Sequence, residues 1–452
     1  MVAVTTMGWL SQIRNRKRIK SVDDVHRSKN LGILSFETAK TMSRLVALYK
    51  SLSDQEINYL RDNVVQSKGV NYLNSADATS LFSLACAERL EDLDFTAAAI
   101  GRLGQKCIDL GFNRFDILYA DLKLGTLHFE TLEYGSRKIE KKIKEIERLV
   151  YATANLHASL QGLGELEVSE RKIKQRKLYC ELGTPDQNVN FDQFDQKLAS
   201  HRKQVRYLKK VSLWNKTFDQ SVEILARITC SVYARICMVF GPYIRDLPAC
   251  GLVRPIKNVI GSRSGPILGA SQHCLVRFHS QKPIRFLDVD GSDKEGSNNN
   301  RVFHAAGPNT VGGSGLAVRY ANVILLVERY LDSNMTIGRD AREELYEMLP
   351  ESLRKSMRSK LRKNVKKGPV TDKLMAGGWK EPLNEMMEWL TPMAHDTLKW
   401  QMERNFGSMK FESKPTVLLL QTLHFSDKEK AEAAIAEVLV GLSCIYWCEK
   451  RL

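Results

Sequence analysis

Apolar residues recur at three- and four-residue steps along most of the chain, which is the spacing of one face of an α-helix. The clearest run opens the C-terminal third and consists of Leu316, Tyr320, Val323, Ile324, Val327 and Leu331. Gly312, Gly313 and Gly315 precede this run and do not propagate a helix well. We therefore place the start of the helix there and expect the side chain of Ser314 to cap it.

The N-terminal part of the chain shows the same spacing. A first helix is predicted by the run Ile33, Phe36, Ala39, Met42, Leu45, Val46 and Tyr49. Ser53 and Glu56 form a capping box, which predicts the start of a second helix. Its inward positions are Ile57, Leu60 and Val64, and we expect it to end at Gly69. A third helical pattern begins at about Asp77 and is last seen at Leu103.

Two long amphipathic stretches in the middle of the chain predict an antiparallel helical hairpin or a coiled coil. The seam positions of the first are Ile139, Ile143, Ile146, Val150, Thr153, His157 and Leu160. After a GLGE stretch, those of the second are Phe191, Phe194, Leu198, His201, Val205 and Leu208. The pattern then continues from Phe218 to Val239. We expect the two seam histidines to be packed side chains in preference to a metal-binding pair.

Residues 241–311 interrupt this regularity, since they are rich in Gly, Pro, Ser and Asn and have no sustained apolar period. Such a composition is typical of a flexible linker. The whole pattern predicts an all-α protein with two helical domains, a long hairpin and this linker. The predicted segments are a basic N-terminal arm at 1–30, an N-terminal helical domain at 31–123, the hairpin at 124–240, the linker at 241–311 and a C-terminal helical domain at 312–445.

The most basic helix of the chain is predicted after Pro350, inside the C-terminal domain. Its cations are Arg354, Lys355, Arg358, Lys360, Arg362, Lys363, Lys366 and Lys367, and no acidic residue follows Glu351. A thin apolar stripe of Leu353, Met357 and Leu361 lies beneath them. The helix can lie along phosphates or contact an acidic partner, but no aromatic residue is interleaved to stack on bases. An interaction helix is therefore favoured over specific recognition of nucleic acid.

The charge balance also favours an anionic partner. Lys and Arg outnumber Asp and Glu by 68 to 52 in 452 residues, which gives a formal net charge of +16. A second basic cluster lies in the N-terminal arm, at Arg14, Arg16, Lys17, Arg18 and Lys20. Such a cluster can act as a nuclear-import signal or bind an acidic membrane surface. We predict a nuclear protein, with the cytoplasmic face of the plasma membrane as the alternative.

Candidate catalytic and metal-binding residues are few. His395 and Asp396 are adjacent, so on a helix their side chains point about 100° apart and do not form an oriented acid–base pair. Cys444 and Cys448 are one helical turn apart, but no second pair at metal-binding spacing accompanies them. The chain has no P-loop, HExxH or GxSxG motif. We therefore predict no catalytic residue, no cofactor and no metal, which indicates a non-enzymatic protein.

Two groups of sequence blocks resemble the plant PSK SIMULATOR family. The first group resembles its N-terminal uncharacterised domain and comprises LGILSFETAKTMSRLVALYKSLSDQEINYLR, SKGVNYL and the LACAERLEDL region. The second resembles its C-terminal uncharacterised domain and comprises GGSGLAVRYANVILLVERYL, AREELYEMLPESLRKSMRSKLR, WLTPMAHDTLKWQMERNF and LLLQTLHFSDKEKAEAAIAEVLVGL. The blocks occur in the same order and cover residues 31–123 and 312–445.

This resemblance implies a land-plant regulator that promotes growth and is connected with signalling by the peptide hormone phytosulfokine. It implies no catalytic residue. Some members of the family carry a glycine for N-terminal myristoylation, whereas Val2 stands in this chain. Our hypothesis is a signalling adaptor that binds other proteins and has no small-molecule substrate. The alternatives are a basic nuclear protein that binds nucleic acid and a peripheral membrane scaffold in defence-related signalling.

Overall fold

The secondary structure of the described chain is helical. A computed structural model describes residues 29–125, 134–180, 191–244, 301–332, 339–366, 373–406 and 417–450. Within these ranges the only β-type pairing is two isolated bridges, Asn30 with Thr217 and Thr310 with Asp427. The predicted all-α fold class is confirmed. Over the same ranges, every helix is too short or too polar to cross a bilayer.

The chain divides into two compact units that do not follow its linear order. The first contains residues 1–66, 92–250 and 399–418, and the second contains residues 67–91, 251–398 and 419–452. Residues 67–91 belong by sequence to the predicted N-terminal domain, yet they pack in the second unit. The predicted domain boundaries stay a prediction, because compact packing does not by itself define what folds alone.

The first unit includes the helix α2 (Ser35–Ser51), which has a buried apolar face. Ala39, Met42 and Leu45 are completely buried. Ile33 was predicted on the same face, but it lies before the helix and is 69% exposed, so that part of the prediction is wrong. The other elements are η2 (Gly32–Leu34), α3 (Asp54–Tyr59), the π-helical η3 (Leu60–Val64), the later part of α5 (Ala78–Gly104), α6 (Leu110–Asn113), α7 (Phe115–Lys123), α8 (Arg137–Cys180), α9 (Phe191–Val211), η4 (Leu213–Asn215) and α10 (Phe218–Phe240).

The predicted start of α3 is confirmed, whereas the predicted end of that helix is wrong. Ser53 caps α3, because its Oγ accepts a hydrogen bond from the backbone N–H of Glu56 at 3.3 Å. Gly69 does not end a helix but lies inside α4 (Lys68–Leu73). A Cβ at Gly69 would stand 2.8 Å from both Met393 Sδ and the Trp389 carbonyl oxygen of α15 (Lys373–Phe406). The glycine is therefore needed for close approach of two helices.

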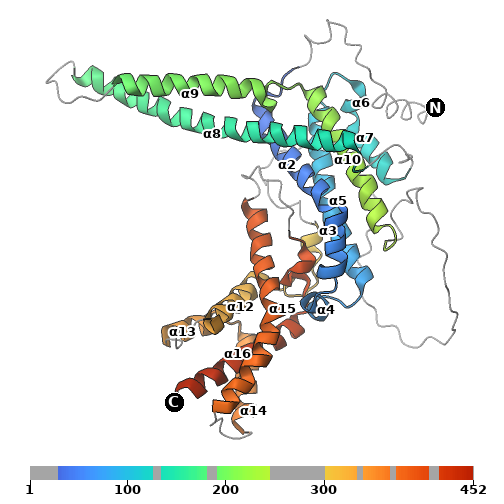
Figure 1. Cartoon of the computed structure of the whole chain (residues 1–452), viewed down its shortest axis with the longest axis vertical. Coiled ribbons are helices and arrows are strands. Elements are labelled where there is room, and N and C mark those ends of the chain that lie inside the picture. Colours follow the sequence, from blue (N-terminus) through green and yellow to red (C-terminus); the bar gives the residue numbers. More distant parts are fainter. Residues whose placement is uncertain are drawn as a thin grey trace. The chain divides into compact units, whose positions relative to one another are not determined.

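α8 and α9 form an antiparallel pair, which Figure 1 shows as two long green helices lying side by side. The Leu213 N–H, just after α9, donates to Thr153 Oγ1 at 3.1 Å, while Arg202 pairs with Glu170 at 3.1 Å. Residues with higher numbers in α8 therefore contact residues with lower numbers in α9, as expected for antiparallel helices. α8 also continues past the GLGE stretch without a break. This geometry agrees with the hairpin expected from the apolar pattern, while a coiled coil stays a prediction.

The second unit holds the helices α12 to α14 and α16, together with α15 up to residue 398. Its elements are α4, the first part of α5, α11 (Arg301–His304), α12 (Ala317–Asp332), α13 (Arg339–Met348), α14 (Glu351–Lys366), α15, η5 (Leu419–Gln421), η6 (Leu423–Phe425) and α16 (Lys428–Lys450). Ser314 does not cap α12 as predicted, because its Oγ donates to the Val311 carbonyl at 2.9 Å. Asp427 caps α16, since its Oδ1 accepts a hydrogen bond from the Lys430 N–H at 2.9 Å.

Residues 67–91 complete the backbone hydrogen bonding of the second unit. The Asp427 N–H donates to the Leu73 carbonyl at 2.8 Å, and Asn74 Nδ2 donates to the Leu420 carbonyl at 2.6 Å. The Leu419 N–H donates to Glu88 Oε2 at 2.8 Å in a buried environment. Buried backbone groups need such partners. The segment that leads into α16 therefore depends on α4 and α5 for its conformation.

The last part of the predicted linker is folded in the second unit. Phe303 stacks on His424 with ring centroids 3.9 Å apart, and its carbonyl accepts a hydrogen bond from His424 Nε2 at 2.8 Å. The Gly312 N–H donates to the His424 carbonyl at 2.8 Å. Residues 301–311 therefore differ from the expected linker, because they supply the aromatic cover of η6. Residues 245–300 of that linker lie outside the described part of the chain.

One local arrangement occurs in both units. In the first unit, residues 29–31 pair with residues 216–218. The Leu31 N–H donates to the Lys216 carbonyl at 2.9 Å, and the Phe218 N–H donates to the Lys29 carbonyl at 3.4 Å. In the second unit, residues 309–311 pair with residues 426–428 through the two equivalent bonds, each of 2.9 Å. The first segment of each pair leads into a helix, α2 or α12, and its partner segment leads into α10 or α16.

The side-chain hydrogen bonds of the two arrangements also correspond. Thr153 of α8 and Thr397 of α15 each donate to the carbonyl four residues earlier at 2.6 Å. Each threonine hydroxyl then accepts a buried backbone N–H, from Leu213 at 3.1 Å and from Leu423 at 2.9 Å. The chain therefore contains the same helical arrangement twice. The intervening helices differ, since α3 to α7 stand between α2 and α8, whereas α13 and α14 stand between α12 and α15.

Candidate functional site

α14 turns only some of its predicted cations toward solvent. Leu353 is completely buried, and Lys360 Nζ forms an ion pair with Glu437 of α16 at 2.5 Å. Arg354 Nη2 donates to the Glu347 carbonyl of α13 at 2.9 Å. These contacts take two of the predicted basic residues into the packing of the unit. The basic face that is open to a partner is therefore narrower than the sequence indicated.

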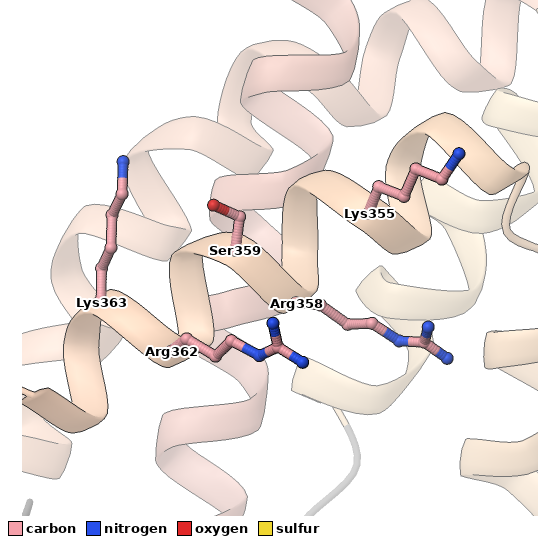
Figure 2. A pocket seen from close by; sticks show the side chains of 5 residues that line it. All are labelled: Lys355, Arg358, Ser359, Arg362 and Lys363. Carbon is pink, nitrogen blue, oxygen red and sulfur yellow. The ribbon is translucent and has the colours of Figure 1, made fainter.

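The outer face of α14 is lined by Lys355, Arg358, Ser359, Arg362 and Lys363, which surround an open concavity of about 390 Å³ (Figure 2). These positions are three and four residues apart, so they share one side of the helix over about 12 Å. Figure 2 shows Arg358 and Arg362 reaching to one side, with the Ser359 hydroxyl between Lys355 and Lys363 along the helix. Four cations and one hydroxyl group therefore line the same concavity.

Two of the outer cations have a contact within the unit. The Arg358 guanidinium lies 5.6 Å from the centroid of the Tyr346 ring and donates a hydrogen bond to the Tyr346 hydroxyl. Lys355 pairs with Glu351 at 2.8 Å, and its hydrogen bond lowers the pKa of the Glu351 carboxyl. That pair is 74% and 80% exposed, so it contributes little and a stronger anion can displace it. Arg358 is thus held in place, while Lys355 stays exchangeable.

The remaining groups of the outer face are not engaged. Within the part of the chain that the structure describes, Arg362 and Lys363 have no ion-pair partner and Ser359 Oγ has no hydrogen bond. Elsewhere in the chain, helical hydroxyls such as that of Thr397 bond to the carbonyl four residues earlier. The Ser359 hydroxyl is therefore available as a donor. An exposed hydroxyl close to two unpaired cations is suited to binding an anion.

Several predicted basic residues cannot be placed at this site. The arm residues Arg14, Arg16, Lys17, Arg18 and Lys20 lie outside the described residues, as do Lys367 and the side chain of Lys366. Sequence reasoning also missed Ser359 and Tyr346. The serine could have been found from its spacing, since cations stand four residues before it and three and four residues after it. The role of Tyr346 depends on how α13 folds against α14.

The candidate acid–base residues of α15 have separate partners. His395 Nε2 lies 3.2 Å from Glu328 Oε2 of α12, and the His395 side chain is 61% exposed. Asp396 Oδ2 instead accepts a hydrogen bond from Gln421 Nε2 at 3.5 Å. The prediction that these two neighbours point apart is confirmed. His395 contacts a carboxylate of α12 and Asp396 a half-buried amide, so the two neighbours do not form an acid–base pair with each other.

The other chemistry-bearing side chains take part in packing. His157 is exposed, and its ring packs edge-on against Phe36, with 5.2 Å between centroids. Burial raises the pKa of the Cys107 and Cys230 thiols to about 12 in each case, so both stay protonated at neutral pH. Cys444 is buried, while the side chain of Cys448 lies outside the described residues. Over the described ranges, no three His, Cys, Asp or Glu side chains are placed to share a metal ion.

Two family models match separate parts of the chain. Residues 33–89 match a domain of unknown function (DUF3475), and residues 310–399 match a protein of unknown function (DUF668). α14 lies inside the second match. The first match crosses the two compact units, because residues 67–89 pack in the second one. No solved structure matches the chain.

Three proteins of Arabidopsis thaliana are similar to nearly the whole chain. Protein PSK SIMULATOR 1 is 26% identical over 428 residues, which cover 92% of this chain and 56% of that protein. Protein PSK SIMULATOR 2 is 24% identical over 439 residues, covering 94% and 61%. Protein PSK SIMULATOR 3 is 25% identical over 426 residues, covering 92% and 56%. The chain spans less than two thirds of these relatives, and its predicted resemblance to them is confirmed.

Proposed function

We propose that this chain, which is similar to PSK SIMULATOR 1 over 92% of its length, is a non-enzymatic regulator in plant signalling connected with phytosulfokine. It acts as an adaptor that promotes growth by binding other signalling proteins. The names of the relatives support the connection with the hormone. The separate partners of His395 and Asp396 support a role without catalysis.

The outer face of α14 is the observation that carries this proposal. It presents Arg362 and Lys363 without ion-pair partners in the described structure, next to Arg358 and Lys355. α14 itself is held in the unit, because Leu353 is completely buried and Lys360 pairs with Glu437 of α16. The cations therefore lie on a fixed helix. A fixed basic face of this kind gives an adaptor a surface for an anionic partner.

A complementation experiment tests the function in the plant. Arabidopsis seedlings that lack the PSK SIMULATOR proteins receive the wild-type chain, the variant Arg362→Ala/Lys363→Ala, or the control Lys141→Ala/Lys144→Ala. The control removes the same charge from exposed positions of α8. Root elongation in response to added phytosulfokine is measured. We expect the wild type and the control to restore the response and the α14 variant to fail.

Two outcomes of that experiment would count against the proposal. If the wild-type chain restores nothing, its link with the hormone is wrong. If the α14 variant restores growth as well as the control does, the outer face of α14 is not the surface that matters. Immunoblots for each chain separate both outcomes from poor accumulation.

The location of the protein is proposed separately. We propose that the N-terminal arm directs the chain to the nucleus, with the inner face of the plasma membrane as the alternative. Replacing Arg14, Arg16, Lys17 and Arg18 with Ala in a fluorescent fusion should then shift the signal from the nucleus to the cytoplasm. An unchanged distribution would show that the arm does not direct the chain to the nucleus. It would leave the proposed role of α14 unaffected.

A further inference from the structure

We infer that the outer face of α14 binds a phosphorylated segment of a partner protein, with the phosphate seated over Ser359. The inference rests on the proposed function, because it names the class of partner that the same surface takes. Its four cations and one hydroxyl are Lys355, Arg358, Arg362, Lys363 and Ser359.

The chemistry of the face favours a phosphate over a carboxylate. A phosphorylated side chain carries a charge of about −1.5 to −2 and three acceptor oxygens. Arg358 and Arg362 reach to the same side of the helix in Figure 2, and guanidinium groups bind phosphate oxygens with paired N–H donors. The Ser359 hydroxyl adds a neutral donor between Lys355 and Lys363. A single carboxylate has too few acceptors and too little charge to engage this number of donors.

Part of the face is organised before a ligand arrives. Arg358 is held by the ring and hydroxyl of Tyr346. Fixing a long side chain in advance lowers the entropy lost on binding. Lys355 exchanges its exposed Glu351 partner for the phosphate, which carries more charge. The site therefore needs no rearrangement of the helix.

A membrane surface fits the face less well than a phosphorylated segment does. Helices that lie in a membrane interface insert an apolar face next to their cations. The apolar side of α14 is turned into the protein, since Leu353 is completely buried and Met357 and Leu361 are half-buried. None of the described residues of α14 is an exposed large hydrophobic residue. The face can attract lipid headgroups but has nothing to insert.

Nucleic acid fits less well for a different reason. The cations extend over about 12 Å, which covers one or two phosphates, whereas sites for single strands take about four or more nucleotides. Such sites also use aromatic rings on which the bases stack. Tyr346 is the aromatic residue beside the face, and its ring is flanked by Arg354 and Arg358 at 4.9 and 5.6 Å. The Tyr346 ring therefore already contacts two guanidinium groups and is not available to stack on a base.

Fluorescence anisotropy with the full chain tests the inference. The probe is a labelled 15-residue peptide with one phosphoserine between acidic residues. A second peptide carries serine at that position, and a third has glutamates added until its net charge equals that of the phosphopeptide. Vesicles of phosphatidylcholine and phosphatidylserine and a 15-nucleotide single-stranded RNA are measured under the same salt conditions.

We expect the phosphopeptide to bind at least about tenfold more tightly than either other peptide, because a phosphate adds several charge-assisted hydrogen bonds. Arg362→Ala/Lys363→Ala should lower its affinity about tenfold or more, and Lys141→Ala/Lys144→Ala should leave it within about twofold. Ser359→Ala should weaken binding a few-fold. Ser359→Glu should abolish it, because the new carboxylate pairs with Lys355 and Lys363 four residues away on either side.

Three results would overturn the inference. Equal affinity for the phosphopeptide and the charge-matched glutamate peptide would show a general acidic surface. Tighter binding of RNA or vesicles that is lost in the α14 variant would assign the face to that ligand. Unchanged phosphopeptide binding by the variant would place the site elsewhere. Circular dichroism confirms that each variant is folded, and success or failure here is independent of whether seedlings respond to phytosulfokine.

Discussion

At the scale of single residues, two buried threonines hold the same position in the two units. Thr153 and Thr397 each accept the buried N–H of a leucine that opens a short 3₁₀ turn. Replacing either threonine with valine keeps the shape but leaves that N–H without its partner. We expect each change to lower the free energy of unfolding by about 1–3 kcal/mol. Urea denaturation followed by circular dichroism measures the loss.

Serine variants are the control for the threonine prediction. Thr153→Ser and Thr397→Ser keep the hydroxyl and remove only a methyl group, so they should retain more of the stability than the valine variants do. Valine variants that are as stable as the wild type would show that the leucine N–H finds another partner. In that case the shared hydrogen bond would not be important to either unit.

His424 makes the second unit sensitive to acid. Its Nε2 carries the proton that it donates to the Phe303 carbonyl, and burial lowers the pKa of the ring, assisted by the nearby His304. An unfolded histidine has a pKa of about 6.5. As the pH falls through this value, the unfolded chain binds a proton that the folded chain resists, so the free energy of unfolding decreases. The decrease ends when the pH passes the folded pKa.

The pH effect is measured by urea denaturation of the wild type and His424→Gln between pH 7.5 and 5.5. The glutamine keeps an N–H donor for the Phe303 carbonyl but does not titrate. We expect the wild type to lose more stability than the variant over this range. Parallel pH profiles would show that His424 is protonated as easily in the folded chain as in the unfolded one.

At the scale of elements, the contact between α4 and α15 depends on one missing side chain. A Cβ at Gly69 would stand 2.8 Å from Met393 Sδ and from a backbone oxygen of α15, closer than real contacts allow. Gly69→Ala should therefore lower the free energy of unfolding by about 1–3 kcal/mol, even though alanine favours helix. Gly162→Ala is the matched control, because Gly162 lies in the helix α8 with open space around it.

The Gly69 prediction is checked in the same denaturation assay. Gly162→Ala should be neutral or stabilising, because alanine is the better helix former. If Gly69→Ala were equally stabilising, α4 could not pack against α15 as closely as the structure shows.

Helices and local caps could be predicted from the sequence, whereas contacts between distant segments could not. The periodicity of α2 and the Ser53 cap depend on neighbouring residues and were confirmed. Gly69 was misjudged because a glycine can end a helix or admit a neighbour, and only the position of α15 decides between them. The outer face of α14 was only partly predictable. Its cations are visible in the sequence, but the contact that turns Lys360 away comes from Glu437 of α16.

At the scale of the whole molecule, the same helical arrangement occurs in both compact units. Each unit uses a short paired segment, three helices and a short 3₁₀ turn that come from separate parts of the chain. The spacing between equivalent residues differs from element to element, and the inserted helices differ as well. Equivalent residues are therefore not separated by a constant number of residues. The repeat could be recognised only from its hydrogen bonds.

The proposed binding surface lies on α14, in the second copy of the arrangement. The elements that the two copies share form the supporting cores, while the outward cations lie on α14, which is not one of the shared elements. The account therefore depends on one location for the anionic partner.

Photo-crosslinking tests that location most directly. The phosphopeptide receives a photoreactive residue next to its phosphoserine and is irradiated with the full chain, and the attachment sites are mapped by mass spectrometry. We predict that the adducts concentrate within residues 351–366 and largely disappear when the serine is not phosphorylated. Adducts of equal yield with both peptides, or adducts concentrated on another element, would contradict the account.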